Sequence, residues 1–411
     1  MLYWLTWSIL VLIIAVGLTA QGVVETLRGV LILQLHPARL ITDYSVVAGP
    51  GAAMVNAALV AAIGLFLLRV NRIQMSGPAL SVVYTMLGFG LFGKTPLTIL
   101  PIILGVFVSA RLAGKHFNQY ILIALFGTAL APVVSAIAVE LSLPGALSWP
   151  LAVAGGVTVG IFLPPAAMAM LRMHQGYSLY NVGMTSGFIG LFVASVMIAG
   201  GVELGSVLIW NTDPTLELRL FIPLLSVVLI AAGVIRGGKS SITDFREISR
   251  RTGRLPSDFM DMVSSEGALV NMGVLGLTSW LYVVVVGAPL NGPVLGGILT
   301  VVGFGAFGKH PRNCFPVVVG IFAATLLFGA DPAAPGPILA LLFGTTLAPI
   351  AGSFGAVIGC VAGFLHFVIV MRSGGWHAGL ALYNNGFAGG LTATLVASVM
   401  EWHHQSERRS K

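Results

Sequence analysis

The feature that most constrains the fold of this chain is an internal repeat. Residues 75–96 read MSGPALSVVYTMLGFGLFGKTP and residues 290–311 read LNGPVLGGILTVVGFGAFGKHP, so the two segments match without a gap at an offset of 215 positions. Three further blocks recur in the same order. Self-similarity on this scale is typical of proteins built from copies of one structural unit. We therefore predict two related units, each covering nearly half of the chain.

The other repeated blocks place polar and helix-breaking residues inside apolar sequence. They pair residues 53–56 with 268–271, residues 125–132 (LFGTALAP) with 342–349 (LFGTTLAP), and residues 174–181 with 377–384. Gly and Pro interrupt the hydrogen bonding of a helix and leave backbone carbonyls free. Broken helices of this kind line the substrate sites of many repeat transporters.

The composition points to a membrane protein. Only 9% of the 411 residues are charged and 57% are hydrophobic, whereas soluble domains carry roughly 25% charged residues. The formal net charge of +7 does not indicate a nucleic-acid partner. The positions of the basic residues along the chain instead indicate which ends of the predicted helices face the cytoplasm. We expect an all-α, multi-pass protein of the plasma or bacterial inner membrane, with the lipid bilayer as its surroundings.

Each unit offers seven apolar runs, so we predict about 14 transmembrane or re-entrant helices. The runs at 77–93 and 336–351 are short, and either could be re-entrant. The first unit has runs near 2–20, 51–70, 77–93, 97–113, 119–139, 148–171 and 178–199, and the second near 218–236, 267–287, 291–308, 313–329, 336–351, 354–371 and 378–400.

An odd number of crossings in each unit would invert the second unit relative to the first. With a cytoplasmic N-terminus, 16 of the 21 Lys and Arg residues would face the cytoplasm, in accord with the positive-inside rule. One re-entrant element in each unit would instead make the repeats parallel. The predicted divisions are a first repeat (1–200), an extracytoplasmic linker (201–217), a second repeat (218–402) with a basic cytoplasmic loop (237–265), and a cytoplasmic tail (403–411).

The duplicated polar residues are the candidate substrate-binding positions. An Asn can offer both a donor and an acceptor to a polar solute, but it can equally bond a neighbouring helix, Tyr can belong to the interfacial belt, and Thr can bond its own backbone. The candidates are Asn181, Asn384, Tyr180, Tyr383, Thr128, Thr345, Asn56 and Asn271.

Charged residues give weaker indications. All 14 carboxylates lie in loops or at the ends of apolar runs, which argues against proton coupling through a buried acid.

Lys94 and Lys309 follow the Gly-rich segments. We expect them to snorkel to an interface, the alternative being a position at the mouth of a re-entrant segment. Arg39 and Asp43 have the spacing of a helical ion pair. No metal-ligand spacing is present, so we expect no metal or cofactor.

Two resemblances follow from these segments. Residues 176–183 (GYSLYNVG) and 379–386 (GLALYNNG), together with Leu27-Arg28-Gly29, are similar to segments of urea transporters. Those proteins are channel-like inverted repeats that carry a small neutral amide. The whole chain more closely resembles a two-repeat family of bacterial membrane proteins of unknown function, which implies the repeat fold and no substrate.

The sequence therefore predicts a transporter or channel-like permease for a small polar solute, with its site between the two repeats. The alternative is a membrane-embedded lipid-handling protein or enzyme, in which Lys94, Lys309, His174 and His377 would contact lipid phosphates. Because no nucleophile–base set is visible, we expect no enzyme activity. The identity of the solute, the coupling ion and the choice between channel and coupled transport stay open. The internal symmetry neither requires nor excludes a homo-oligomer.

Overall fold

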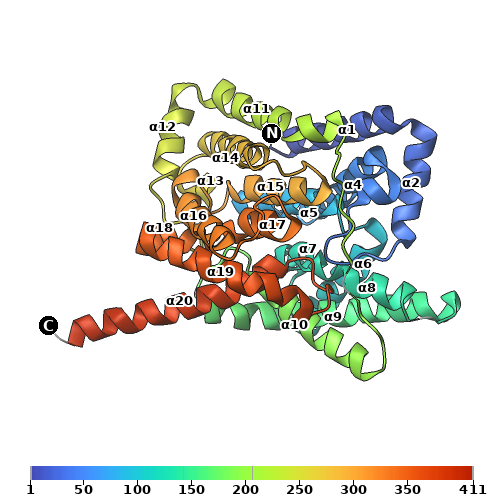
Figure 1. The fold of residues 1–411 in the computed structure, drawn as a ribbon. Coiled ribbons are helices and arrows are strands. Elements are labelled where there is room, and N and C mark those ends of the chain that lie inside the picture. Colours follow the sequence, from blue (N-terminus) through green and yellow to red (C-terminus); the bar gives the residue numbers. More distant parts are fainter. Residues whose placement is uncertain (1, 142, 206, 410–411) are drawn as a thin grey trace.

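The protein is all-helical, as its sequence predicts. The structure is a computed structural model that describes residues 2–141, 143–205 and 207–409. Within these ranges it contains no β-strand, and extended backbone pairs only in isolated bridges, between Thr42 and Ile209 and between Asp43 and Phe92. Residues 410–411 of the predicted tail and residue 206 of the predicted linker lie outside the described residues. Figure 1 shows the helices in chain order.

The helices of the first half lie between residues 2 and 199. They are α1 (Leu2–Gln21), α2 (Val23–Leu35), α3 (Tyr44–Ala48), α4 (Pro50–Val70), α5 (Gly77–Gly90), α6 (Pro96–Leu112), α7 (Ile121–Gly127), α8 (Ala131–Val139), α9 (Gly145–His174) and α10 (Asn181–Ala199). Two 3₁₀ turns join them, η1 (Phe117–Gln119) and η2 (Thr128–Leu130).

The helices of the second half follow the same order. They are α11 (Leu216–Gly237), α12 (Lys239–Ile248), α13 (Phe259–Met262), α14 (Ser265–Val285), α15 (Gly292–Phe304), α16 (Pro311–Leu327), α17 (Pro335–Gly344), α18 (Ala348–Phe354), α19 (Ala356–Trp376) and α20 (Asn384–Arg409), with the 3₁₀ turn η3 (Thr345–Leu347). Helix α12 falls within the predicted basic loop, and the predicted apolar runs did not include α2.

Nine helices of the described ranges are long and apolar enough to cross a membrane. They are α1, α4, the α7–α8 segment, α9, α10, α11, α14, the α17–α18 segment and α19. Every predicted apolar run coincides with helix, but four of these helices (α5, α6, α15 and α16) are shorter. Helices α5 and α15, with 14 and 13 residues, extend about 20 Å, against roughly 30 Å of hydrocarbon. The run at 336–351 is not short, because α17–α18 covers 20 residues.

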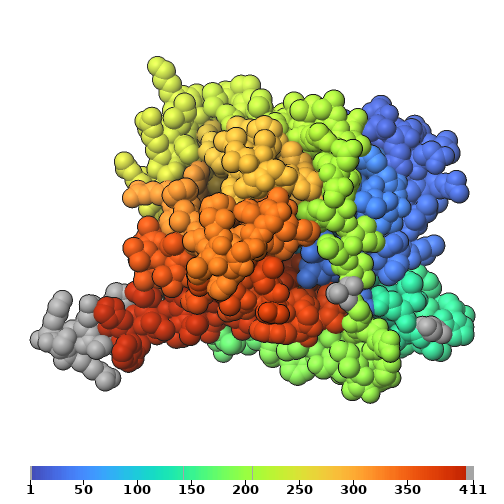
Figure 2. Space-filling view, viewed as in Figure 1, coloured from blue at the N-terminus to red at the C-terminus, as the bar shows by residue number. Residues whose placement is uncertain are grey.

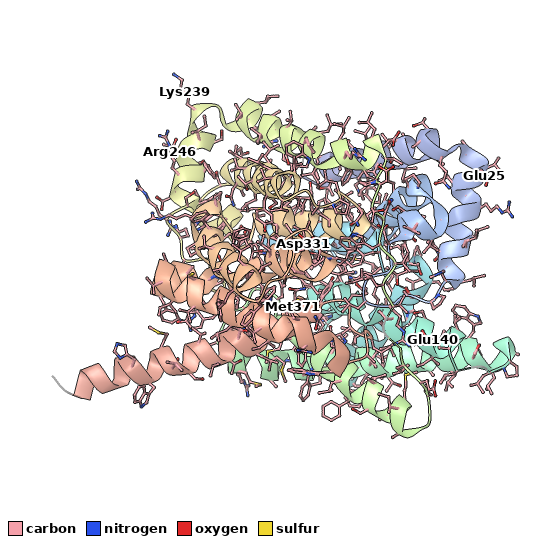
Figure 3. All side chains as sticks on the ribbon, viewed as in Figure 1. Glu25, Glu140, Lys239, Arg246, Asp331 and Met371 are labelled. Carbon is pink, nitrogen blue, oxygen red and sulfur yellow. The ribbon has the colours of Figure 1, made fainter. Side chains whose placement is uncertain are left out.

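The outer surface carries the apolar side chains that a bilayer requires. Trp4, Val24, Phe162, Ile235 and Val357 are among the large apolar residues exposed on it. Figure 2 shows one face of this surface, on which the linker between α10 and α11 runs across the molecule between the two halves of the chain. Figure 3 shows Glu25, Lys239 and Arg246 at the periphery of the molecule. These features support a membrane protein.

The short helices α5 and α15 are started by matched caps. The side chain of Ser76 accepts a hydrogen bond from Ala79 N at the start of α5, and Asn291 accepts one from Val294 N at the start of α15. A proline follows within the first helical turn of each, where its missing N–H is tolerated. The two caps fix where each short helix begins.

The next helices, α6 and α16, begin soon after α5 and α15 end. Thr95 and Thr98 form a reciprocal capping box at the start of α6, and His310 and Asn313 form one at the start of α16. Each box satisfies the first N–H groups of its helix. The caps therefore hold Lys94 and Lys309, the residues just before them, in tight turns between two helices.

The two halves meet through reciprocal contacts between helices. A Cβ added at Gly88 would lie 2.7 Å from Gly296 O, and one added at Gly303 would lie 3.1 Å from Ser81 O. Since position 88 matches 303 and position 81 matches 296 in the repeat, these are the same contact made twice. Such self-complementary pairing is the mark of a two-fold axis, which here is internal to the chain. Small residues allow α5 and α15 to cross this closely.

Helices α10 and α20 form a second crossing on this pseudo-two-fold axis. A Cβ on Gly183 would lie 2.9 Å from the Cα of Gly386, and one on Gly386 would lie 2.8 Å from the Cα of Gly183. Both glycines lie in the first turn of their helices. The N-terminal ends of α10 and α20 therefore meet inside the protein, where their partial positive charges add.

Two aspartates connect each half to the short helix of the other. Asp43 accepts a hydrogen bond from Gly292 N at 3.3 Å, and Asp258 accepts one from Gly77 N at 3.1 Å. Both lie outside the membrane-spanning helices, and burial raises the pKa of each carboxyl although these N–H bonds oppose the rise. Arg39 does not pair with Asp43 as its spacing suggested; its guanidinium binds the carboxylate of Glu140.

Candidate functional site

Two lysines are the most unusual residues of the interior. The side chains of Lys94 and Lys309 are fully buried, so the prediction that they snorkel to an interface is wrong. Each backbone N–H bonds back to the helix that it follows, from Lys94 N to Phe89 O and from Lys309 N to Phe304 O. The turn therefore points each side chain inward. Burial of a lysine in an apolar region carries a large desolvation cost unless polar groups receive it.

The amino group of each lysine is bound by a matched pair of hydroxyls. Lys94 Nζ donates to Thr128 Oγ1 at 2.8 Å and to Tyr383 OH at 2.6 Å. Lys309 Nζ donates to Thr345 Oγ1 at 2.7 Å and to Tyr180 OH. In each case the threonine comes from the same half of the chain and the tyrosine from the other half.

Aromatic rings complete the surroundings of the lysines. Lys94 Nζ lies 4.5 Å from the ring centroid of Tyr383 and 5.3 Å from that of Phe89. The distances from Lys309 Nζ to Tyr180 and Phe304 are also 4.5 Å and 5.3 Å. Ring faces attract a cation electrostatically. No carboxylate of the described residues lies within ion-pair distance of either lysine.

The two threonines occupy the breaks in the helices where the sequence predicted them. Thr128 begins η2 between α7 and α8, and Thr345 begins η3 between α17 and α18. Each hydroxyl donates to the carbonyl three residues earlier, Leu125 O at 2.6 Å and Leu342 O at 2.7 Å. Because the proton is used in this way, the oxygen is left to accept from the lysine. The expected bond to the backbone is present, and the same oxygen also accepts from a lysine.

Asn56 and Asn271 hold the turns that carry the lysines. Asn56 Nδ2 donates to Gly90 O and Lys94 O at 2.7 and 2.8 Å, and Asn271 Nδ2 donates to Gly305 O and Lys309 O at 2.6 and 2.7 Å. Both asparagines are fully buried. Their amides bind backbone carbonyls that have no partner at the ends of the short helices. These contacts are structural, and they hold the backbone of Lys94 and Lys309 in place.

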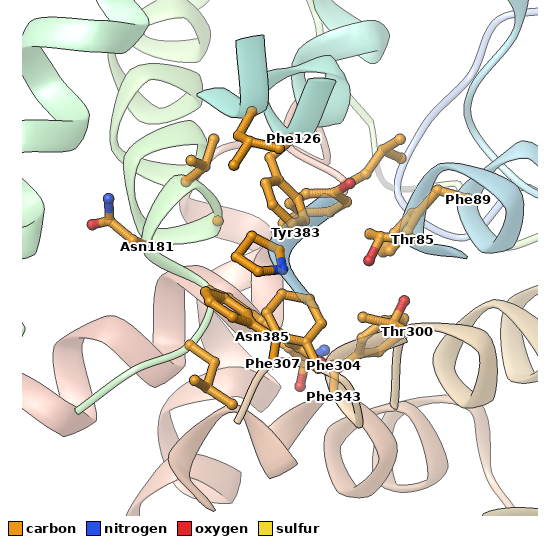
Figure 4. A pocket seen from close by; sticks show the side chains of 18 of the residues that line it. Thr85, Phe89, Phe126, Asn181, Thr300, Phe304, Phe307, Phe343, Tyr383 and Asn385 are labelled. Carbon is orange, nitrogen blue, oxygen red and sulfur yellow. The ribbon is translucent and has the colours of Figure 1, made fainter. Parts of the chain in front are cut away.

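Asn181 and Asn384 are also occupied by contacts within their own half. Asn181 Oδ1 lies 2.9 Å from His174 Nε2, and Asn384 Oδ1 lies 3.1 Å from His377 Nε2. The amide Nδ2 of each binds a carbonyl fourteen residues earlier, in α9 and α19 respectively. Asn181 also lines the neighbouring cavity, at whose edge Figure 4 shows its side chain. The duplicated His therefore fixes the start of α10 and α20.

The predicted tyrosines line a cavity on the pseudo-two-fold axis. Its volume is about 170 Å³. The ring centroids of Tyr180 and Phe304 are 4.7 Å apart, and those of Tyr383 and Phe89 are 4.5 Å apart. Figure 4 shows the labelled aromatic side chains around this space. The matched pairs in its wall are Thr85 with Thr300, Phe89 with Phe304, Phe126 with Phe343, Leu179 with Leu382, Tyr180 with Tyr383, and Gly183 with Gly386.

The chemistry of this cavity is that of an apolar chamber with basic groups behind its wall. The hydroxyls of Thr85 and Thr300 are engaged by carbonyls of their own helices. The lysines lie behind the tyrosine and phenylalanine rings. Among the described residues, no group of three or more His, Cys, Asp or Glu could hold a metal ion. Such a chamber suits binding of a small molecule better than acid–base catalysis.

The sequence reasoning did not include the lysines among the site residues. It did identify the tyrosines and threonines that bind them. The available signal was that both lysines recur at the end of the same Gly-rich block, while every carboxylate lies outside the apolar runs.

The comparisons with known proteins identify a family that matches both halves of the chain. The family model described as "Protein of unknown function (DUF1576)" matches residues 23–199 and 238–402. No curated protein and no solved structure matches the chain significantly, so the likeness to urea transporters is not supported. The two matched stretches correspond closely to the two halves and cover most of the chain. The chain belongs to the DUF1576 family of proteins of unknown function.

Proposed function

We propose that this protein is a membrane transporter or permease for a small solute, and that the solute binds in the cavity on the pseudo-two-fold axis. The observation that carries the proposal is that matched residues of both halves form the wall of this cavity. Secondary transporters commonly bind substrate where two repeats meet near mid-membrane, beside broken helices. Helices α7–α8 and α17–α18 are broken at Thr128 and Thr345, next to the two lysines.

We further propose that the repeats are inverted in the membrane. The meeting of the N-terminal ends of α10 and α20 at Gly183 and Gly386 favours this arrangement. Two helices that start from a common crossing can extend toward opposite faces of the membrane. Their N-terminal ends, which carry partial positive charge, then lie at the substrate site. The bias of Lys and Arg toward one face also favours an inner-membrane protein with this topology.

The lysine–tyrosine bonds supply a simple way to open the cavity. Lys94 to Tyr383 and Lys309 to Tyr180 each join one half to the other. In inverted repeats these two links lie on opposite sides of the membrane midplane. Breaking one while keeping the other would open the cavity to one face only, which is the requirement for alternating access.

The test is solute flux in proteoliposomes. The purified protein would be assayed with a panel of small amides, monocarboxylates, amines and inorganic ions. We expect saturable uptake of at least one class, reduced at least tenfold in the Tyr180→Phe, Tyr383→Phe double variant, which loses only two hydroxyls. Tyr120→Phe, at a half-buried position beside η1, is the matched control. Absence of protein-dependent flux for the whole panel would refute the proposal.

The geometry does not favour the lipid-handling alternative. Lys94 and Lys309 are buried and bound by hydroxyls, while His174 and His377 bind asparagines. None of the four is presented to a lipid phosphate.

A further inference from the structure

The cavity wall departs from symmetry at one polar position. Position 182 in the first half matches 385 in the second, and both residues line the cavity, but the first is Val182 and the second is Asn385. A change from valine to asparagine places, at this position of a largely apolar wall, a side-chain amide that the first half lacks.

A second asymmetry lies directly behind Asn385. A Cβ on Gly127 would lie 2.4 Å from Leu163, and a Cβ on the matched Gly344 would lie 2.8 Å from His366. Leu163 and His366 therefore occupy the same place in the two halves. His366 is fully buried, and its Nε2 lies 3.0 Å from Asn385 Oδ1.

This contact fixes how Asn385 presents its amide. An amide oxygen only accepts, so Nε2 of His366 carries the proton and donates it. The Asn385 oxygen is thereby turned toward the histidine, and its Nδ2 has no hydrogen-bond partner among the described residues. The other ring nitrogen, His366 Nδ1, is buried without a partner. A buried polar atom without a partner is costly and calls for an explanation. The orientation of Asn385 by Nε2 explains why a histidine occupies this position.

We propose that Asn385 is a solute-binding residue that donates through Nδ2 to an oxygen of a small monocarboxylate with an apolar body. His366 acts as a positioning residue for it. This inference rests on the proposed transport function and names the class of solute. Figure 4 shows Asn385 among the aromatic side chains that would contact the apolar body.

Size and charge favour this class. The cavity of about 170 Å³ is similar to an apolar protein cavity of about 150 Å³ that holds benzene. Lys94 and Lys309 lie behind the wall with no carboxylate of the described residues beside them, so an anion is favoured over a cation. A neutral amide of the same shape would keep the bond to Asn385 but lose this attraction.

Equilibrium binding of radiolabelled benzoate to the purified protein in nanodiscs at pH 7.5 tests the proposal. Benzamide and benzylammonium are competitors of the same shape with charges of zero and plus one. We expect saturable benzoate binding, weaker competition by benzamide and none by benzylammonium. Asn385→Val should weaken benzoate binding by about 10- to 100-fold, the value of one hydrogen bond to a charged acceptor.

The symmetry of the chain supplies the controls. Valine is the natural residue at the matched position 182, and leucine at 163, so Asn385→Val and His366→Leu should fold, which thermal melting would verify. Tyr120→Phe, at a half-buried position outside the cavity wall, should not weaken benzoate binding. His366→Leu should lower the preference for benzoate over benzamide, and His366→Gln, which can still donate to Asn385, should restore it.

Several outcomes would overturn the inference. They are the absence of saturable benzoate binding, equal affinity in Asn385→Val and the natural protein, equal weakening in Tyr120→Phe, and preference for benzylammonium. If another solute of the panel is still transported, the proposed function stands and this inference fails. If no solute is transported, the proposed function itself fails.

Discussion

Removal of one lysine should open the cavity toward one face of the membrane. Lys94→Met removes the bond to Tyr383 while keeping a side chain of similar length, and Lys309→Met removes the matched bond to Tyr180. A hydrogen bond to a charged group contributes about 1.5–3 kcal/mol. The loss of about 2 kcal/mol would shift the equilibrium between the closed cavity and one open form by roughly 30-fold.

Thiol labelling from each side of the membrane measures this shift. The reporter is Val182→Cys in the cavity wall, in a protein whose Cys314 and Cys360 are replaced by Ala. A membrane-impermeant maleimide is applied to sealed vesicles of each orientation. We expect Lys94→Met to accelerate labelling from one side and Lys309→Met from the other. Acceleration from the same side in both variants, or in neither, would refute the reasoning.

Four other substitutions test the structural roles of the duplicated residues. Asn56→Leu and Asn271→Leu each leave two buried carbonyls unsatisfied and should lower the free energy of unfolding by about 2–5 kcal/mol, measured by denaturation in detergent, and equal stability would contradict this role. Gly386→Leu inserts a side chain where a Cβ already lies 2.8 Å from Gly183, and it should lower thermal stability more than a leucine at the exposed Gly375. Asn384→Ala should reduce stability together with flux, and loss of flux at unchanged stability would indicate a direct solute contact.

The repeat made much of the fold predictable from sequence. The blocks around Lys94, Thr128 and Tyr180 recur in the same order, and this shared order brings one set of side chains together twice although the spacing between the blocks differs. The helices coincide with the apolar runs because an apolar segment in a bilayer must satisfy its own backbone. How many of these helices cross the membrane depends on packing and tilt, which hydropathy does not encode.

The candidate site was only partly predictable. A lysine at the end of an apolar run is typical of a side chain that extends to the membrane interface. The local sequence does not show that Lys94 donates to Thr128 and Tyr383, which lie 34 and 289 residues away from it. The asparagines were expected at a solute site because polar side chains in apolar helices are costly. Asn56 and Asn271 bind backbone carbonyls at the ends of the short helices, a need that becomes visible only when the helix ends are known, and a solute contact of the asparagines stays a prediction.

The asymmetry at Asn385 was hidden for a different reason. In the sequence it follows Asn384 and resembles an extension of the duplicated block. The aligned segments GYSLYNVG and GLALYNNG place Val182 against Asn385, but only the structure shows that His366 stands where the first half has Leu163 and binds Asn385.

The orientation of the two repeats is the central claim and can be measured directly. Ala113 ends α6 and Phe328 ends α16 at matched, exposed positions. Single cysteines at these positions, in the protein without Cys314 and Cys360, would be labelled with an impermeant maleimide in intact cells and in inverted vesicles. Inverted repeats predict that positions 113 and 328 react from opposite faces. Reaction of both from the same face would show parallel repeats and contradict the proposed mechanism.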